Sequence, residues 1–135
     1  MKILELSFGT FEFFANIIIG KINDGVHYDA ECNDLLVASA IAHYGANHIL
    51  GYISIRENDY SVDPMIYLNN KLFKNLACIS ILEKNKVTPS TVEIEARFFK
   101  KEKFKSFSNA EEALAWTNTQ IASSLAAVFN PTQLN

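Results

Sequence analysis

Residues 16–21 read Asn-Ile-Ile-Ile-Gly-Lys, a segment with almost no polar face. Branched apolar side chains favour strands, and near-continuous apolar strands occur inside sheets that are covered on both faces. We therefore expect this segment to lie inside a sheet rather than at its edge.

The uninterrupted apolar runs of the chain are far shorter than the roughly 20 residues of a membrane-spanning helix, so we expect no membrane span.

The first part of the chain, residues 3–22, is rich in Phe, Ile and Leu and is broken at positions 9–10 and 15–16. This pattern predicts strand, turn and strand, which is an opening antiparallel hairpin, and residues 23–25 predict a further turn.

Helix signals follow. Asp29 suits the N-cap of a helix over residues 29–44, and Gly45 suits its end. The next expected elements are a buried strand over 48–55, a polar loop over 56–63, a helix from Asp63-Pro64 to about Lys74 with Met65, Leu68 and Leu72 on one face, and a strand over 76–82. A helix from a capping box at 90–93 and an edge strand over 104–107 follow. The last helix opens at a second capping box over 108–111, carries Leu114, Ile121, Leu125 and Val128, and ends at Asn130.

Strands that alternate with helices after an opening hairpin define the α/β class. We expect a single domain over residues 1–135, with 130–135 as a tail, because this length suits one hydrophobic core. The predicted architecture is a mixed β-sheet with β-α crossovers and about four helices, most of them on one face.

Composition excludes several classes of function. Twelve Lys and Arg residues against fifteen Asp and Glu residues give a net charge of −3, so the chain lacks the basic excess of a nucleic-acid-binding protein. Two cysteines are too few for a disulfide scaffold or a Cys-rich zinc site, and we expect a reducing cytoplasm. The five glycines are scattered singly, so no phosphate-binding loop is predicted and we expect no cofactor.

The three histidines do not form a metal motif. His43 falls in the last turn of a predicted helix, where a cation suits the helix dipole, and His48 opens a predicted strand. Only His27, Tyr28 and Asp29 form a compact titratable cluster in a turn, which makes them the candidate residues if the protein is an enzyme.

The other chemically versatile residues have structural explanations. Cys32 and Cys78 lie in apolar stretches, where a thiol stays protonated and inert. Glu93 and Glu95 stand at the start of a predicted helix, as do Glu111 and Glu112 at another, which favours dipole pairing and solvation over acid–base catalysis.

Charge and aromatic residues are unevenly distributed. Residues 1–64 hold nine acidic and three basic residues, a net charge of −6, whereas residues 65–135 hold six acidic and nine basic residues, a net charge of +3. The positive charge concentrates at Arg97, Lys100, Lys101, Lys103 and Lys105. We interpret the lysines as a guard against edge-to-edge strand pairing, and a patch for an acidic partner or an anionic headgroup is the alternative. Phenylalanines crowd residues 8–14, which favours either burial on both faces or an apolar patch for a second copy or an apolar ligand.

The order of elements resembles the STAS domain, the fold of bacterial anti-sigma-factor antagonists and of the cytoplasmic tails of sulfate transporters. The closer likeness is to a group of small, stand-alone bacterial proteins of uncharacterised function. It covers about residues 3–118. The segments that carry it are NIIIGKINDGVHYD at 16–29, ILGYISIRENDYSVDP at 49–64 and LACISIL at 76–82.

In that family a serine in the loop before the second helix accepts a phosphate, which switches binding to a kinase partner. The resemblance implies a switch or interaction loop here at Asp59, Tyr60, Ser61 and Asp63. The loop differs from the family's Asp-Ser-Gly pattern because it has no glycine, and Asp59 and Asp63 would repel a phosphate on Ser61. The structural alternative is that Ser61 or Asp63 caps the following helix.

Three classes of function remain open. The first is a non-enzymatic cytoplasmic regulatory module that binds a protein partner or forms a homodimer. The second is a binding protein for an apolar small molecule or lipid, and the third is an enzyme built on the cluster at His27.

Overall fold

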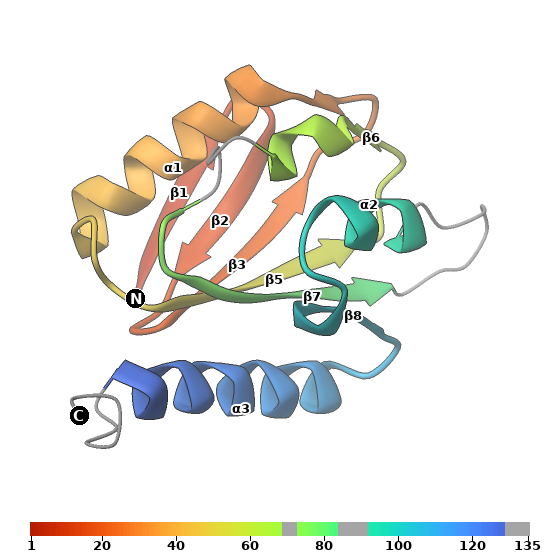
Figure 1. Cartoon of the computed structure of the whole chain (residues 1–135). Coiled ribbons are helices and arrows are strands. Elements are labelled where there is room, and N and C mark those ends of the chain that lie inside the picture. The colour runs from red at the N-terminus through yellow and green to blue at the C-terminus, as the bar shows by residue number, and fades with distance from the viewer. Residues whose placement is uncertain (69–72, 84–91, 129–135) are drawn as a thin grey trace.

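The computed structural model describes residues 1–68, 73–83 and 92–128, which form a mixed six-stranded sheet with helices on both faces (Figure 1). The strand order is β1-β2-β3-β5-β7-β8; β1, β2 and β3 are antiparallel, and β3, β5, β7 and β8 are parallel. The strands are β1 (Lys2–Leu6), β2 (Gly9–Phe13), β3 (Ile17–Ile22), β5 (Leu50–Arg56), β7 (Leu76–Glu83) and β8 (Phe104–Phe107). The expected α/β class with a mixed sheet is therefore confirmed.

The isoleucine-rich segment lies inside the sheet, as expected. It forms β3, which pairs antiparallel with β2 on one side and parallel with β5 on the other. Both faces of the strand are covered, since Ile17 and Ile18 point to opposite faces and are both buried.

The opening segment contains three strands rather than the expected two. The first turn lies at Ser7 and Phe8, and Gly9 already belongs to β2, where it pairs with Leu6 and Ile22. A Cβ atom at Gly9 would lie 2.7 Å from the Lys21 carbonyl oxygen. This glycine therefore permits close approach of neighbouring strands, and it does not mark a turn.

Helix α1 (Ala30–Tyr44) begins and ends where the sequence predicts. The Asp29 side chain accepts a hydrogen bond of 3.1 Å from the Cys32 amide, and Gly45 adopts a φ of 87° while its amide donates to the Ile41 carbonyl oxygen. Asp29 precedes this helix at the end of β4 (His27–Tyr28), which pairs with β6 (Ser61–Val62) in a second, two-stranded parallel sheet.

The helix expected from Asp63 to about Lys74 is a short 3-10 helix, η1 (Pro64–Tyr67), in its described part; residues 69–72 lie outside the description. Asp63 caps it as predicted, since its side chain accepts from the Met65 amide at 3.0 Å. The buried residue is Ile66, whereas Met65 is exposed, because the tighter winding changes which side chain faces inward.

The remaining helices are α2 (Val92–Phe98), the 3-10 turn η2 (Lys101–Lys103) and α3 (Ala110–Val128). The capping box proposed for α2 begins at residues that lie outside the description. At α3 the cap is Asn109 rather than Ser108, since the Asn109 side chain accepts from the Glu112 amide. No helix in the described part of the chain is long and apolar enough to cross a membrane.

Helices lie on both faces, with the larger share on one face as expected, and the expected number of about four helices is not confirmed. The described residues form three α-helices; α1 and α2 cover one face together with η1, and α3 covers the other (Figure 1). Of the apolar residues that the last helix carries, only some face inward. Ala113, Thr117 and Ile121 are buried, and Leu114, Leu125 and Val128 are exposed.

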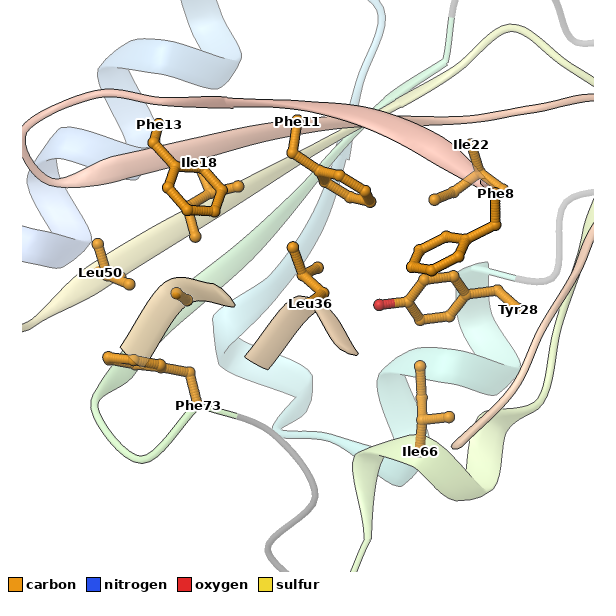
Figure 2. Close-up of a cluster of buried hydrophobic side chains, with 11 residues drawn as sticks. Phe8, Phe11, Phe13, Ile18, Ile22, Tyr28, Leu36, Leu50, Ile66 and Phe73 are labelled. Carbon is orange, nitrogen blue, oxygen red and sulfur yellow. The ribbon is translucent and has the colours of Figure 1, made fainter. Parts of the chain in front are cut away.

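The two faces differ in the size of their side chains. On the α3 side, a Cβ atom at Gly51 would lie 2.5 Å from the Thr117 side chain, so the helix packs almost directly on the strand. On the α1 side, large aromatic residues stand between sheet and helix. Figure 2 shows Phe11 and Phe13 pointing from the sheet toward Leu36 of α1. The α1 side is therefore the thicker layer of the molecule.

Candidate functional site

A cavity of about 80 Å³ lies in this thicker layer. Alternate residues of β5 point to the α1 side, so Leu50, Tyr52, Ser54 and Arg56 reach its wall from one strand. Helix α1 contributes Leu36 and Ala40, the loop before η1 contributes Tyr60 and Val62, and β7 contributes Ile79 and Ile81. The cavity has room for roughly five to eight non-hydrogen atoms, taking the volume that one water needs as a guide.

One end of the cavity wall is polar. Both terminal nitrogens of Arg56 donate to the carboxylate of Glu95 on α2, at 2.5 Å to Oε2 and 2.6 Å to Oε1. The Tyr67 hydroxyl donates to Glu95 Oε1 at 2.7 Å. Glu95 is 1% exposed, so this ion pair lies inside the protein rather than on its surface.

Two tyrosines beside this pair stay neutral. Burial, with the nearby Glu95 charge as a further cause, raises the pKa of the Tyr67 hydroxyl well above its usual value. Burial also raises the pKa of the Tyr52 hydroxyl above the ordinary range. Both hydroxyls are therefore hydrogen-bond donors over the whole physiological pH range.

The Tyr52 side chain crosses from β5 to β3. A Cβ atom at Gly20 would collide with the Tyr52 hydroxyl and would lie 2.9 Å from the Phe11 ring. The hydroxyl therefore occupies the space that the missing side chain of Gly20 leaves. No hydrogen bond to it is found among the described residues, and every fully buried polar side-chain atom there is paired, so the Tyr52 oxygen stays accessible.

The loop at Asp59, Tyr60, Ser61 and Asp63 forms part of the rim of the cavity. Its side chains point alternately toward the cavity and toward solvent. Tyr60 points inward, with its hydroxyl 3.3 Å from Ser54 Oγ and its ring 5.8 Å from the Arg56 guanidinium carbon. Ser61 is exposed. The predicted site residues thus separate, because adjacent residues of the extended segment point in opposite directions.

Hydrogen bonds fix this loop against the segment that precedes α1. The Asp59 carbonyl oxygen accepts from the Gly25 amide at 2.7 Å, the Ser61 amide donates to the Val26 carbonyl at 3.0 Å, and the Asp63 amide donates to the Tyr28 carbonyl at 2.9 Å. The loop is therefore an ordered part of the fold rather than a loose connection.

The candidate enzyme cluster does not converge on one point. His27 is exposed, and its Nδ1 lies 2.7 Å from Ser61 Oγ. Tyr28 points inward to Asn33, where burial raises the pKa of its hydroxyl, and Asp29 is occupied as the cap of α1. The structure instead brings His27 to Ser61, a pairing across 34 positions that no local pattern predicts.

The cysteines and other candidate ligands do not add a reactive centre. Cys32 and Cys78 are both free thiols, and burial raises the pKa of each, to about 11 for Cys78. Among residues 1–68, 73–83 and 92–128, no three His, Cys, Asp or Glu side chains are grouped to hold a metal ion.

The structure shows where the lysines of residues 100–105 and the phenylalanines of residues 8–14 lie. Lys105 lies on β8, an edge strand of the sheet, and its ammonium stands 5.4 Å from the centre of the Phe107 ring. Phe8, Phe11 and Phe13 belong to the core, so only Phe14, 38% exposed, remains of the proposed aromatic patch.

Sequence reasoning missed the polar residues of the cavity. Glu95 was interpreted as a solvated residue at the start of a helix, and the structure buries it against Arg56. A signal was present, because Glu95 precedes the buried Ala96 and lies four residues before Phe99, which follows α2 and packs against the same cluster. Arg56 likewise follows Leu50, Tyr52 and Ser54 at a spacing of two.

A comparison with known proteins found no matching family model, no similar curated protein and no similar solved structure. The resemblance to the STAS domain therefore stays an expectation from the sequence.

Proposed function

We propose that this chain is a non-enzymatic binding protein that takes a small, mainly apolar molecule into the cavity between the sheet and α1. The observation that carries this proposal is the cavity itself, about 80 Å³ in volume, with an apolar wall and polar groups at one end. Such a combination is typical of ligand sites, in which apolar side chains supply affinity and a few polar groups fix orientation.

The cavity suits a ligand about the size of a substituted benzene ring. An engineered apolar cavity of about 150 Å³ in another protein stays dry and binds benzene, so a single ring is the upper limit for the cavity of about 80 Å³ here. The ligand would contact Leu36 and Ala40 of α1 on one side and β5 on the other.

The test compares two variants that make the same change on the same helix. Ala40→Leu places three extra carbon atoms in the cavity wall, whereas Ala38→Leu places them on the exposed side of α1. Toluene and benzyl alcohol are titrated against the native protein and both variants by ligand-observed NMR and by thermal unfolding.

We expect the native protein and Ala38→Leu to bind both probes with a raised Tm, and Ala40→Leu to bind at least tenfold more weakly. Equal binding by a folded Ala40→Leu variant, or no binding by the native protein, would contradict the proposal. Organic extraction of protein purified from its own cells would in addition identify a natural ligand.

A second candidate function is a cytoplasmic regulatory module of the STAS-like type, which would act on a protein partner or a second copy. The observation in its favour is the exposed Ser61 hydroxyl, held 2.7 Å from the His27 ring in an ordered loop. A protonated His27 would offset part of the repulsion that Asp59 and Asp63 exert on a phosphate at this position.

Mass spectrometry of the protein isolated from its own cells tests this second function. A phosphate-sized increment that Ser61→Ala removes would support a switch at this loop, with Ser39→Ala on α1 as a control. An unmodified chain, together with identical sedimentation of the native protein and Ser61→Asp, would count against it.

A further inference from the structure

We infer that the polar group of the ligand is a neutral oxygen, a carbonyl or hydroxyl, that hydrogen-bonds to Tyr52, and that the cavity rejects carboxylates and ammonium groups of the same size. This inference rests on the proposed binding function and specifies the chemistry of that same site.

The charge of the cavity wall is the first property that limits the ligand. An arginine in a ligand cavity ordinarily suggests that an anion binds there, because its guanidinium matches a carboxylate. Here that role is already filled from within the chain. Both terminal nitrogens of Arg56 are engaged by both oxygens of Glu95, and the pair has no net charge.

Neither Arg56 nor Glu95 can leave this ion pair without a large cost in free energy. Glu95 is held by Arg56 and also accepts from the Tyr67 hydroxyl at 2.7 Å. An anionic ligand would have to displace Glu95 from Arg56 and leave its carboxylate buried without its counter-ion. A cationic ligand that displaced Arg56 from Glu95 would likewise leave the guanidinium buried without its counter-ion. Separating a buried pair in this way is strongly unfavourable.

The hydrogen-bonding capacity of the cavity wall limits the ligand further. The Tyr52 hydroxyl is accessible and has no hydrogen-bond partner among the described residues. It stays protonated because burial opposes its ionisation, so it offers one O–H donor and an acceptor oxygen. The Ser54 and Tyr60 hydroxyls are nearby but 3.3 Å apart, a long separation for two hydroxyl oxygens, so either can turn toward a ligand.

The neutral charge of the Arg56–Glu95 pair, its strength and the free hydrogen-bonding capacity of Tyr52 together rank the possible ligands. A hydrocarbon fills the apolar wall but leaves the Tyr52 hydroxyl without a partner and deprives it of water. A charged group loses its hydration and finds no free counter-charge. A neutral oxygen meets the hydroxyl and loses least on transfer from water, so it binds most tightly.

The experiment uses five probes built on one benzene ring, so that size stays nearly constant. Benzyl alcohol and benzaldehyde carry a neutral oxygen, benzoate and benzylammonium are charged at neutral pH, and toluene is apolar. Their dissociation constants are measured at pH 7 with the full chain, by ligand-observed NMR and isothermal titration calorimetry.

We expect benzyl alcohol and benzaldehyde to bind at least tenfold more tightly than benzoate or benzylammonium, and severalfold more tightly than toluene. Tyr52→Phe should abolish the preference for benzyl alcohol over toluene while leaving toluene binding within twofold. Tyr44→Phe is the matched control, because its hydroxyl donates to the Phe14 carbonyl oxygen and is not part of the cavity wall.

The outcomes distinguish failure of the binding function from failure of the neutral-oxygen preference. If none of the probes binds, the proposed binding function is wrong and the inference falls with it. If benzoate, benzylammonium or toluene binds as tightly as benzyl alcohol, the binding function stands and the neutral-oxygen inference is wrong. The ranking in the native protein decides this even if Tyr52→Phe does not fold.

Discussion

Two glycines in the sheet show how single residues shape opposite faces of this protein. Gly51 faces α3, where a Cβ atom would lie 2.5 Å from Thr117, so its absence permits close helix packing. Gly20 faces the other way and leaves the space that the Tyr52 hydroxyl fills. The absence of a side chain at Gly51 thus allows α3 to pack closely on the sheet. The absence of a side chain at Gly20 allows the Tyr52 hydroxyl to enter an apolar layer.

Cys78, fully buried on the α3 side, makes stability depend on alkaline pH. Burial raises the pKa of its thiol from 9.0 to about 11, so between these values the unfolded chain releases a proton that the folded chain keeps. The free energy of unfolding therefore falls as pH rises from 9 to 11, with a limiting slope of about 1.4 kcal/mol per pH unit from this residue.

Urea denaturation between pH 8 and 9 measures the onset of this slope, where the tyrosines of the unfolded chain are still largely protonated. Cys78→Ala should lower stability at every pH and remove most of the slope between pH 8 and 9, whereas Cys32→Ala should leave most of it in place. Above pH 9, Tyr28, Tyr52 and Tyr67 add to the slope, because burial raises the pKa of their hydroxyls too. An unchanged slope in Cys78→Ala would show that other groups cause the alkaline loss.

At the scale of elements, α2 is the helix that depends most on contacts with the rest of the chain. It has only seven residues, too few to be stable alone, and it reaches the sheet through the bond between Glu95 and Arg56 of β5. Tyr67 joins the same carboxylate to η1. One buried side chain therefore holds three elements in place around the end of the cavity.

Removing the charge of Glu95 should consequently cost much more than a surface substitution. We expect Glu95→Gln to lower the free energy of unfolding by about 3–5 kcal/mol, because Arg56 keeps a buried charge without its counter-ion. Glu93→Gln, two residues away and exposed, should change it by about 0.5 kcal/mol or less.

The double variant Arg56→Met with Glu95→Leu separates pairing from packing. It should recover most of the loss, since replacing a buried ion pair with apolar residues of similar volume is often neutral or stabilising. Urea denaturation of all four proteins measures the effect. If the double variant is as unstable as Glu95→Gln, the loss arises from packing of α2 and not from the unpaired charge.

At the scale of the whole molecule, local signals were enough to predict the class and most elements. The isoleucines of β3, the Asp29 and Gly45 caps of α1 and the Asp63-Pro64 start of η1 act within a few residues of their own position. What local patterns could not predict depends on contacts between distant residues. The placement of α3 opposite α1 and the burial of Glu95 are examples, since Arg56 and Glu95 are 39 positions apart.

The difference between the two faces predicts how the molecule responds to pressure. Pressure favours unfolding in proportion to the internal void that unfolding eliminates, and here that void lies on the α1 side. Filling part of it with Ala40→Leu should reduce the volume change of unfolding, whereas Ala38→Leu on the outer side of the same helix should leave that change as it is.

High-pressure unfolding followed by the fluorescence of Trp116, the single tryptophan, gives the volume change directly. Saturating benzyl alcohol should act as Ala40→Leu does and reduce the volume change in the native protein, because a bound ligand occupies the same space. It should have little effect on Ala40→Leu itself. Equal volume changes in all three proteins, with and without the alcohol, would mean that the cavity is already filled by water in solution, and a hydrated cavity would weaken the case for an apolar ligand.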